Sequence, residues 1–159
     1  MKAVRWSGAF TLIEVMVVVI VLGILAAIAV PRFVGAQTET AVAATAEDLK
    51  AIETAIGMYK AKEGAWPGEV AQTLTPPGVE TYFKGPVPLA KPCPIGGVYD
   101  YDAPSGGSPA MISIRAIAGN VFTAQAAADL DEHFDDGVAT TGAVRIPSAT
   151  QITFTLGTD

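Results

Sequence analysis

The chain begins with a long apolar run and continues with an amphipathic pattern. Residues 10–30 are 21 positions with one charged residue, Glu14, and as a helix they would be roughly 31 Å long, about one hydrocarbon core. Beyond this run, apolar residues recur every three or four positions, which is typical of a helix with one buried face. That face comprises Val42, Ala46, Leu49, Ile52, Ile56 and Tyr59. The pattern predicts one long helix over residues 10–63, bent or interrupted near Gly23 and Pro31.

The rest of the chain predicts a small sheet. Gly64 and Pro67 end the helix, and residues 65–109 hold nine of the eleven prolines, which predicts irregular structure. Within it we expect short extended pieces, at residues 79–83 and 98–101. Strands are then expected over residues 111–117, 143–146 and 151–156, with a short helix over 122–134 that Asn120 can cap. The predicted class is α+β: a long N-terminal helix, with a transmembrane half and an amphipathic half, packed on a small antiparallel β-sheet.

Charge and cysteine count argue against nucleic-acid binding and against a disulfide within the chain. The net charge is −6 and becomes about −8 if Lys2 and Arg5 are removed with a leader. Such an acidic chain has no electrostatic footprint for nucleic acid, so no nucleic-acid partner is expected. The single cysteine, Cys93, cannot form a disulfide within the chain.

The apolar run admits two interpretations. One is a secretory signal peptide with an A-x-A site at residues 27–29, whose removal would release a soluble secreted binding protein. The other is a permanent anchor, with Lys2 and Arg5 keeping the N-terminus cytoplasmic. Glu14 favours the anchor, because an acid costs about 2.5–3.5 kcal/mol at mid-bilayer and less near the interface. A signal peptide gains nothing from that cost, whereas a filament subunit could pair the acid with a neighbour's positive charge.

The residues around this acid resemble a known motif. The segment Gly8-Ala9-Phe10-Thr11-Leu12-Ile13-Glu14 is similar to the prepilin peptidase motif of type IV pilins and pseudopilins. The resemblance implies cleavage between Ala9 and Phe10, N-methylation of Phe10, and pairing of Glu14 with the N-terminal amine of a neighbouring subunit. Gly23, Pro31 and Arg32 also fall where pilins place a glycine, a helix-bending proline and a charge.

One position departs from that pattern. The family usually has glycine immediately before the cut, where this chain has Ala9 and places Gly8 one residue earlier. Cleavage after Gly8 is the alternative, and it would put Glu14 one residue out of register.

A second resemblance covers the predicted end of the long helix. Residues 59–67, from Tyr59 to Trp66-Pro67, are similar to the helix end of major pseudopilins of type II secretion. A departure accompanies it: an Asp-Pro-Trp-Gly-like stretch would be expected before Tyr99, and Pro92-Cys93-Pro94 stands there instead.

The resemblance implies a domain organisation and a function. It divides the chain into a leader at residues 1–9, a transmembrane and assembly helix at 10–33, and a globular pilin-like domain at 34–159. The expected function is that of a filament subunit, foremost a pseudopilin of a type II secretion system that helps export folded proteins. The alternatives are a surface type IV pilin for adhesion, motility or DNA uptake, and the secreted binding protein described above.

Partners and location follow from the same resemblance. The expected partners are other copies of the chain or related subunits, the prepilin peptidase, and an inner-membrane assembly platform with its ATPase. The chain would cross the bacterial inner membrane once, with its N-terminus cytoplasmic and its body periplasmic, and assemble into a periplasmic or surface filament.

An acidic cluster near residue 133 is the remaining candidate for chemistry. Asp131, Asp135 and Asp136 carry the hard oxygen ligands that Ca²⁺ prefers, but their spacing does not match an EF-hand. Major pseudopilins have a calcium-binding C-terminal loop, which does not map onto this segment. We therefore expect a solvated helix end and no cofactor. No nucleophile accompanies His133, so no catalytic residue is predicted and the chain is not expected to be an enzyme.

Overall fold

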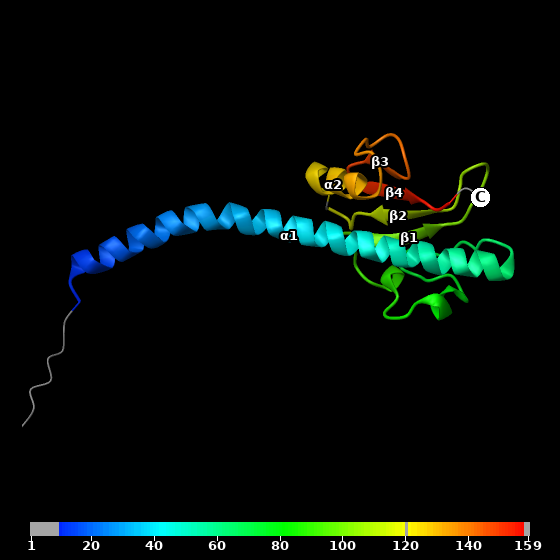
Figure 1. Cartoon of the computed structure of the whole chain (residues 1–159), viewed down its shortest axis with the longest axis horizontal. Coiled ribbons are helices and arrows are strands. Elements are labelled where there is room, and N and C mark those ends of the chain that lie inside the picture. Colours follow the sequence, from blue (N-terminus) through cyan, green and yellow to red (C-terminus); the bar gives the residue numbers. More distant parts are fainter. Residues whose placement is uncertain (1–9, 120, 158–159) are drawn as a thin grey trace, which may run out of the picture. The chain divides into compact units, whose positions relative to one another are not determined.

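The computed structural model describes residues 10–119 and 121–157, with the backbone only at residues 30–34. Its largest element is helix α1, Leu12–Glu63 (Figure 1). The chain forms two compact units that divide between Gln37 and Thr38. Gly23 and Pro31 both lie within α1, so the predicted interruption is absent and a bend there stays a prediction.

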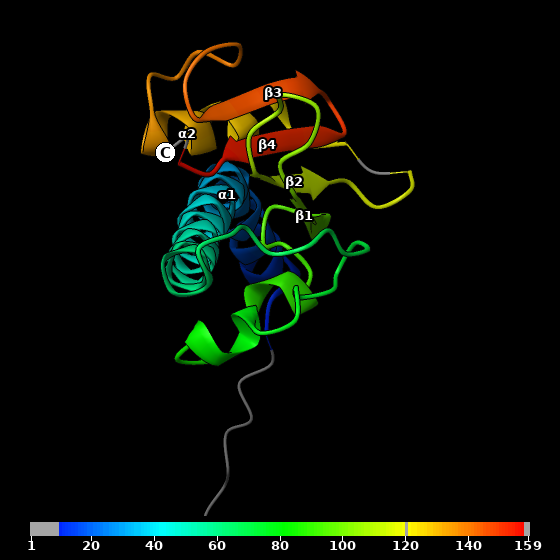
Figure 2. The same cartoon turned by 90° about the vertical axis from the view of Figure 1, so that its right-hand side faces the viewer.

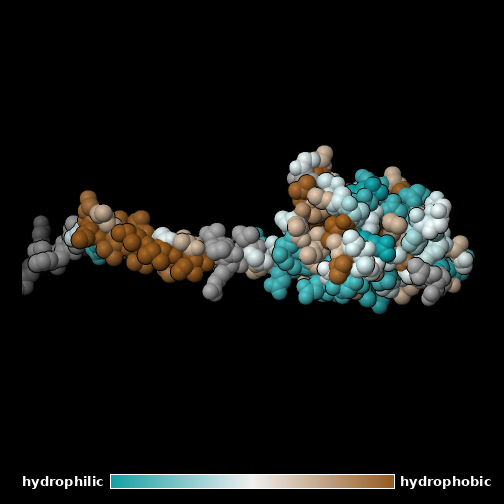
Figure 3. Space-filling model, turned by 90° about the horizontal axis from the view of Figure 1, so that it is seen from above, coloured by the Kyte–Doolittle hydropathy of each residue, from teal (hydrophilic) through white to brown (hydrophobic). Residues whose placement is uncertain are grey.

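The described part of the first unit is an apolar helix in which no side chain is buried. Thr11 precedes α1, and its hydroxyl accepts a hydrogen bond from the Glu14 backbone N–H at 3.3 Å, which caps the first turn. Residues Leu12–Ala29 have a mean hydropathy of 3.0 and are 0% buried, and they are long and apolar enough to cross a membrane. Figure 3 shows hydrophobic surface along this segment.

The second unit is built on the amphipathic half of α1. The predicted face is confirmed: Val42, Ala46, Leu49, Ile52 and Ile56 are all buried in the core, and Tyr59 is half-buried against it. The helix ends at Gly64, whose backbone N–H donates to the Lys60 carbonyl at 2.8 Å and whose φ of 73° favours glycine. Figure 2 shows this half of α1 lying beside the sheet, and the predicted fold class is confirmed.

Four antiparallel strands form the sheet, in the order β1-β2-β4-β3. Their bounds are β1 Val98–Asp102, β2 Met111–Arg115, β3 Val144–Ser148 and β4 Gln151–Thr155. Tyr99 pairs with Ile114, and Ile114 with Ile152. These side chains are buried in the core, and since strand side chains alternate between faces, the intervening polar residues lie on the outer face.

Two sequence predictions are corrected here. The piece expected to be extended over residues 79–83 is a 3-10 helix, η1, Val79–Tyr82. Gly78 starts it with a φ of 90°, and the Val79 N–H donates to the Pro76 carbonyl at 3.1 Å. A second 3-10 helix, η2, spans Pro88–Ala90. Short hydrogen-bonded turns satisfy the backbone of a proline-rich segment that cannot pair in a sheet.

The second correction concerns helix α2. It spans Ala124–Phe134, and its N-cap is Thr123, whose hydroxyl accepts a hydrogen bond from the Ala126 N–H at 3.1 Å. Phe122 is buried but precedes the helix. The predicted cap, Asn120, lies outside the described residues.

Candidate assembly site

Phe10 and Glu14 lie four residues apart at the start of the apolar helix, and both side chains are exposed. Phe10 is 75% exposed and precedes α1, while Glu14 is exposed in its first turn. In the described part of the chain, no hydrogen bond or ion pair of the Glu14 side chain is recorded. Gly8 and Ala9 lie outside the described residues, so the cleavage position stays a prediction.

Burial separates the two halves of α1 as the apolar pattern predicts. Large apolar side chains from Leu12 to Ile28 are about half or more exposed, among them Val19 at 61% and Leu25 at 57%. On the amphipathic half, Leu49, Ile52 and Ile56 are 0% exposed. The buried stripe of the second half therefore packs within the second unit, whereas the large apolar side chains of the first half, among the residues that the structure describes, are exposed.

Gly23 lies within this exposed stretch. A Cβ added there would meet nothing within 4 Å, so no contact with the described residues requires a glycine. The side chains of Pro31 and Arg32 lie outside what the structure describes.

Buried hydroxyl and thiol groups join the body half of α1 to the segments that cover it. The Tyr99 hydroxyl donates to Asp48 Oδ2 at 3.1 Å, and the Tyr101 hydroxyl donates to the Pro67 carbonyl at 3.2 Å. Cys93 Sγ lies 3.6 Å from Thr45 Oγ1. Burial raises the pKa of Cys93 and of both tyrosines, so these groups stay neutral and act as packing and hydrogen-bonding contacts.

Sequence reasoning missed an ion-pair group on the outer face of the sheet. Arg115 Nε lies 2.8 Å from Asp100 Oδ2, and Arg115 Nη2 lies 3.3 Å from Asp102 Oδ1. The Ser113 hydroxyl donates to Asp102. Burial and the Asp102 charge raise the pKa of Asp100, and Arg115 opposes that shift. The sequence signal that could have found this group is the alternation of polar and apolar residues along β1 and β2. It places the polar residues of both strands on one face, but which of them are neighbours follows only from the strand register.

The structure does not bring the candidate calcium ligands together. Asp135 accepts hydrogen bonds from the Ala143 and Val144 N–H groups, so it is committed to the loop before β3. Asp136 accepts from the Val138 N–H at 2.9 Å and the Thr141 hydroxyl at 2.7 Å, which lower its pKa. Both carboxylates are exposed at a helix end.

Asp131 contradicts the expectation of a solvated cluster. It is 0% exposed, and neither carboxylate oxygen has a hydrogen-bond partner among the residues that the structure describes. Burial raises its pKa, and the charges of Asp136 and Asp135 add to the shift. Among the described residues, no group of three or more His, Cys, Asp or Glu side chains is arranged to hold a metal ion. Asp131 is buried because it lies four residues after the buried Ala127, on the same face of α2.

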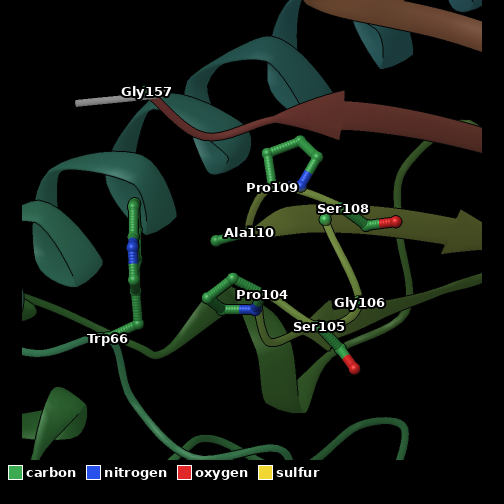
Figure 4. Close-up of a pocket in the computed structure, with 9 residues that line it drawn as sticks. Trp66, Pro104, Ser105, Gly106, Ser108, Pro109, Ala110 and Gly157 are labelled. Atoms are coloured by element: carbon green, nitrogen blue, oxygen red, sulfur yellow. The ribbon is translucent and has the colours of Figure 1, made fainter.

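His133 and the cavities supply no catalytic arrangement in the described chain. The His133 ring contacts the Phe134 ring edge-on at 5.6 Å between centroids. A cavity of about 620 Å³ lies between Trp66 and the turn joining β1 to β2 (Figure 4). Its lining consists of Trp66, prolines, glycines, serines and one alanine, with no acid or base beside the serine hydroxyls. It is a hollow at the end of the sheet, with Lys60 Nζ lying 4.2 Å from the Trp66 ring centre.

An exposed apolar half-helix that continues into a helix packed on an antiparallel sheet defines a pilin-like subunit. Residues 7–30 match the prokaryotic N-terminal methylation motif. The fold is similar to the major type IV pilin PilA1 from Clostridium difficile, with a TM-score of 0.52 and 18% identity over 75% of this chain and 96% of that one. That similarity shows the fold.

Relatives specify the family further. The chain is 35% identical over 119 residues to the type II secretion system core protein G of Pseudomonas aeruginosa, covering 66% of this chain and 80% of that protein. It is 42% identical over 67 residues to the Vibrio cholerae protein of the same name, covering 42% and 46%. The Escherichia coli protein is 33% identical over 92 residues, covering 57% and 59%. The chain belongs to the type II secretion system core protein G family, whose members are structural pseudopilins.

Proposed function

We propose that this chain is a pseudopilin that polymerises into the filament of a type II secretion system and so helps export folded proteins. The observation that carries the proposal is the half-helix Leu12–Ala29, which is wholly apolar on all sides apart from Glu14 and is 0% buried. Such a surface requires lipid before assembly and other subunits after it. A packed bundle of these half-helices is as dry as lipid, so transfer from membrane to filament keeps the apolar surface away from water.

Processing would prepare the chain for assembly. A prepilin peptidase would cut between Ala9 and Phe10, removing Lys2 and Arg5 with the leader, and the new amine of Phe10 would be methylated. The motif match over residues 7–30 supports this step. Before cleavage the basic leader would hold the N-terminus in the cytoplasm. The chain would then cross the inner membrane once, with its body in the periplasm.

Glu14 would set the register between subunits. Its carboxylate is four residues from the new Phe10 amine, which is positively charged, and its side chain has no recorded partner within the described chain. A neighbour's amine can neutralise the acid in the dry bundle, where attraction between opposite charges is strong but desolvation offsets much of the gain. A filament subunit needs such a specific contact, because apolar surfaces alone slide past one another.

No catalytic role is proposed for the chain. Its work would be mechanical: an assembly platform in the inner membrane and its ATPase would insert each subunit at the base of the growing filament. Heterologous contacts that do not close produce a filament.

A surface type IV pilin remains the second candidate. It is kept because Pro92-Cys93-Pro94 departs from the Asp-Pro-Trp-Gly-like stretch expected before Tyr99 in a major pseudopilin. Both candidates use the same half-helix and the same processing.

The test combines mass and microscopy. Intact-mass analysis of the membrane-extracted chain is expected to show loss of residues 1–9 plus one methyl group, and negative-stain microscopy of cells overproducing the chain with its secretion machinery is expected to show filaments. A mature chain that starts at Val30 would support the secreted protein and refute the proposal. Filaments that require a pilus machinery in place of the secretion platform would support the surface pilin.

A further inference from the structure

A groove of about 450 Å³ lies on the solvent side of the amphipathic half of α1. Its lining includes Ala51, Thr54 and Met58 on α1, together with Tyr82 at the end of η1 and Phe83 directly after it. Met58 is 48% exposed. The helix residues recur every three or four positions, so they form a second stripe on α1, distinct from the stripe that faces the sheet.

Charged residues surround this groove unevenly. Lys50 and Lys84 line it together with one acid, Glu47. Both lysines are exposed, and no contact of either side chain is recorded among the described residues. The groove therefore offers an apolar floor with two cations and one acid at its rim.

The opposite character is found around α2. The sequence contains no Lys or Arg between residues 116 and 144, while it places five acids there. Of these, Glu132, Asp135 and Asp136 are exposed, Asp129 is half-buried and Asp131 is buried. Figures 1 and 2 place α2 and the segment that contains η1 on opposite sides of the body half of α1. The body is thus acidic on one side, and its apolar groove with two lysines is on the other.

An apolar side chain projects from the acidic side. Val138 is 48% exposed in the loop after α2. That loop is held by the hydrogen bonds of Asp136 to the Val138 N–H and the Thr141 hydroxyl, so Val138 is presented on a hydrogen-bonded turn. Glu132 is exposed one turn of helix before Asp136.

We propose that the acidic α2 side of one copy of this chain, with Val138 at its centre, docks into the groove between Lys50 and Lys84 of a neighbouring copy. The inference rests on the proposed filament function and names a contact between the bodies in addition to the half-helix bundle. The charges are complementary, and exposed apolar groups meet on both sides. Because the two surfaces are different and lie on opposite sides of the body, each copy can use both, which gives an open chain of contacts.

A second copy fits better than a different acidic partner. In a filament, identical bodies are packed at high local concentration, and two acidic α2 sides cannot face each other without repulsion. The groove instead combines Lys50 and Lys84 with apolar side chains, so it can attract the acidic α2 side of another copy. The contact lies in water, so salt should weaken it.

The test is a charge swap in the full chain, assembled by its machinery. Lys84→Glu alone and Glu132→Lys alone are each expected to lower filament yield at least fivefold, and the double variant that carries both is expected to recover most of it. Lys91→Glu is the matched control, since it makes the same charge change on an exposed residue outside the groove, and it should assemble normally. Melting temperatures of all variants confirm folding.

A cross-linking experiment gives a second measurement. With Cys93 replaced by serine, Thr54→Cys combined with Val138→Cys should give disulfide-linked ladders in filaments, whereas Lys91→Cys combined with Val138→Cys should not. Single reversals that assemble normally, a double variant no better than the singles, or absence of the specific ladder would each overturn the contact. If the wild-type chain forms filaments in the same experiment, the proposed function is supported even when the contact is refuted. If the wild-type chain forms no filaments, both the proposed function and the proposed contact are refuted.

Discussion

The hydroxyl of Tyr99 donates a hydrogen bond to Asp48 at 3.1 Å, joining β1 to the amphipathic half of α1. Tyr99 is 0% exposed, so the bond is largely shielded from water. We expect Tyr99→Phe to lower the free energy of unfolding of the body, residues 34–159, by about 1–2 kcal/mol, because the acceptor is charged. Tyr82→Phe is the control, since no hydrogen bond of its hydroxyl is recorded and its loss should cost under about 0.5 kcal/mol. Urea unfolding followed by circular dichroism checks both, and equal losses would assign no special role to the bond.

The two stripes of α1 are expected to respond differently to one charge. Leu49 is 0% exposed in the core, whereas Ala51 is exposed in the groove. Leu49→Asp should unfold the body, because an unpaired buried charge is among the largest single-site costs. Ala51→Asp should leave it folded with nearly unchanged melting temperature. Near-ultraviolet circular dichroism distinguishes the cases, and a folded Leu49→Asp body would show that the core face is wrongly assigned.

Asp131 should make stability depend on pH. Its pKa is raised by burial and by Asp136 and Asp135, so the folded body binds this proton more tightly than the unfolded chain does. The contribution is fully favourable below the unfolded pKa, near 3.8, and is lost as pH rises through the higher folded pKa. Asp131→Asn should therefore stabilise the body at pH 7 relative to wild type, by a margin that shrinks as pH falls to 4.

Unfolding midpoints between pH 4 and pH 7 measure that margin. Asp136→Asn is the control with the opposite sign, because hydrogen bonds to Thr141 and Val138 lower the Asp136 pKa. An Asp131→Asn variant that is less stable than wild type at pH 7 would mean that its carboxylate has a partner.

Calcium is expected to bind weakly or not at all. Asp135 and Asp136 are exposed and accept hydrogen bonds from the loop, whereas Asp131 is buried, and among the described residues no group of three such side chains is arranged to hold a metal ion. Millimolar Ca²⁺ should therefore shift the melting temperature of the body little, and no more than Mg²⁺ does. A rise of many degrees specific to Ca²⁺, abolished in Asp131→Asn, would demonstrate a site through ligand linkage.

Glu14→Ala should separate insertion from assembly. Removing the acid relieves a cost of about 2.5–3.5 kcal/mol or less in the bilayer, so membrane insertion should be unchanged or improved. Filaments should be lost, because the subunit can no longer pair with a neighbour's amine. Membrane fractionation and electron microscopy measure the two effects, and normal filaments would refute the pairing.

The sequence by itself determined the long helix, its two halves and the α+β class. Apolar spacing identified the buried stripe from Val42 to Ile56 because a helix has one fixed period. Three strands were predicted close to their observed places, and the extended piece expected over residues 98–101 is strand β1. Alternation could indicate strands because a period of two is equally local. The motif at residues 8–14 identified the superfamily because its residues are contiguous.

Tertiary structure decided what distant segments do to one another. Two local features were still predicted wrongly or missed: the 3-10 helix at residues 79–82 and the Thr123 cap. The 3-10 helix stands where an extended piece was expected, because the prolines and Gly78 favour hydrogen-bonded turns, which the alternation of apolar and polar residues does not indicate. Asp131 looked like its exposed neighbours Asp135 and Asp136, and only the packing of α2 showed that its carboxylate is buried without a partner. Tyr99 meets Asp48 across 51 positions of sequence, and Arg115 meets Asp100 across a strand register. Such contacts depend on how elements pack, and packing depends on the shape of the whole core, which no short window of sequence contains.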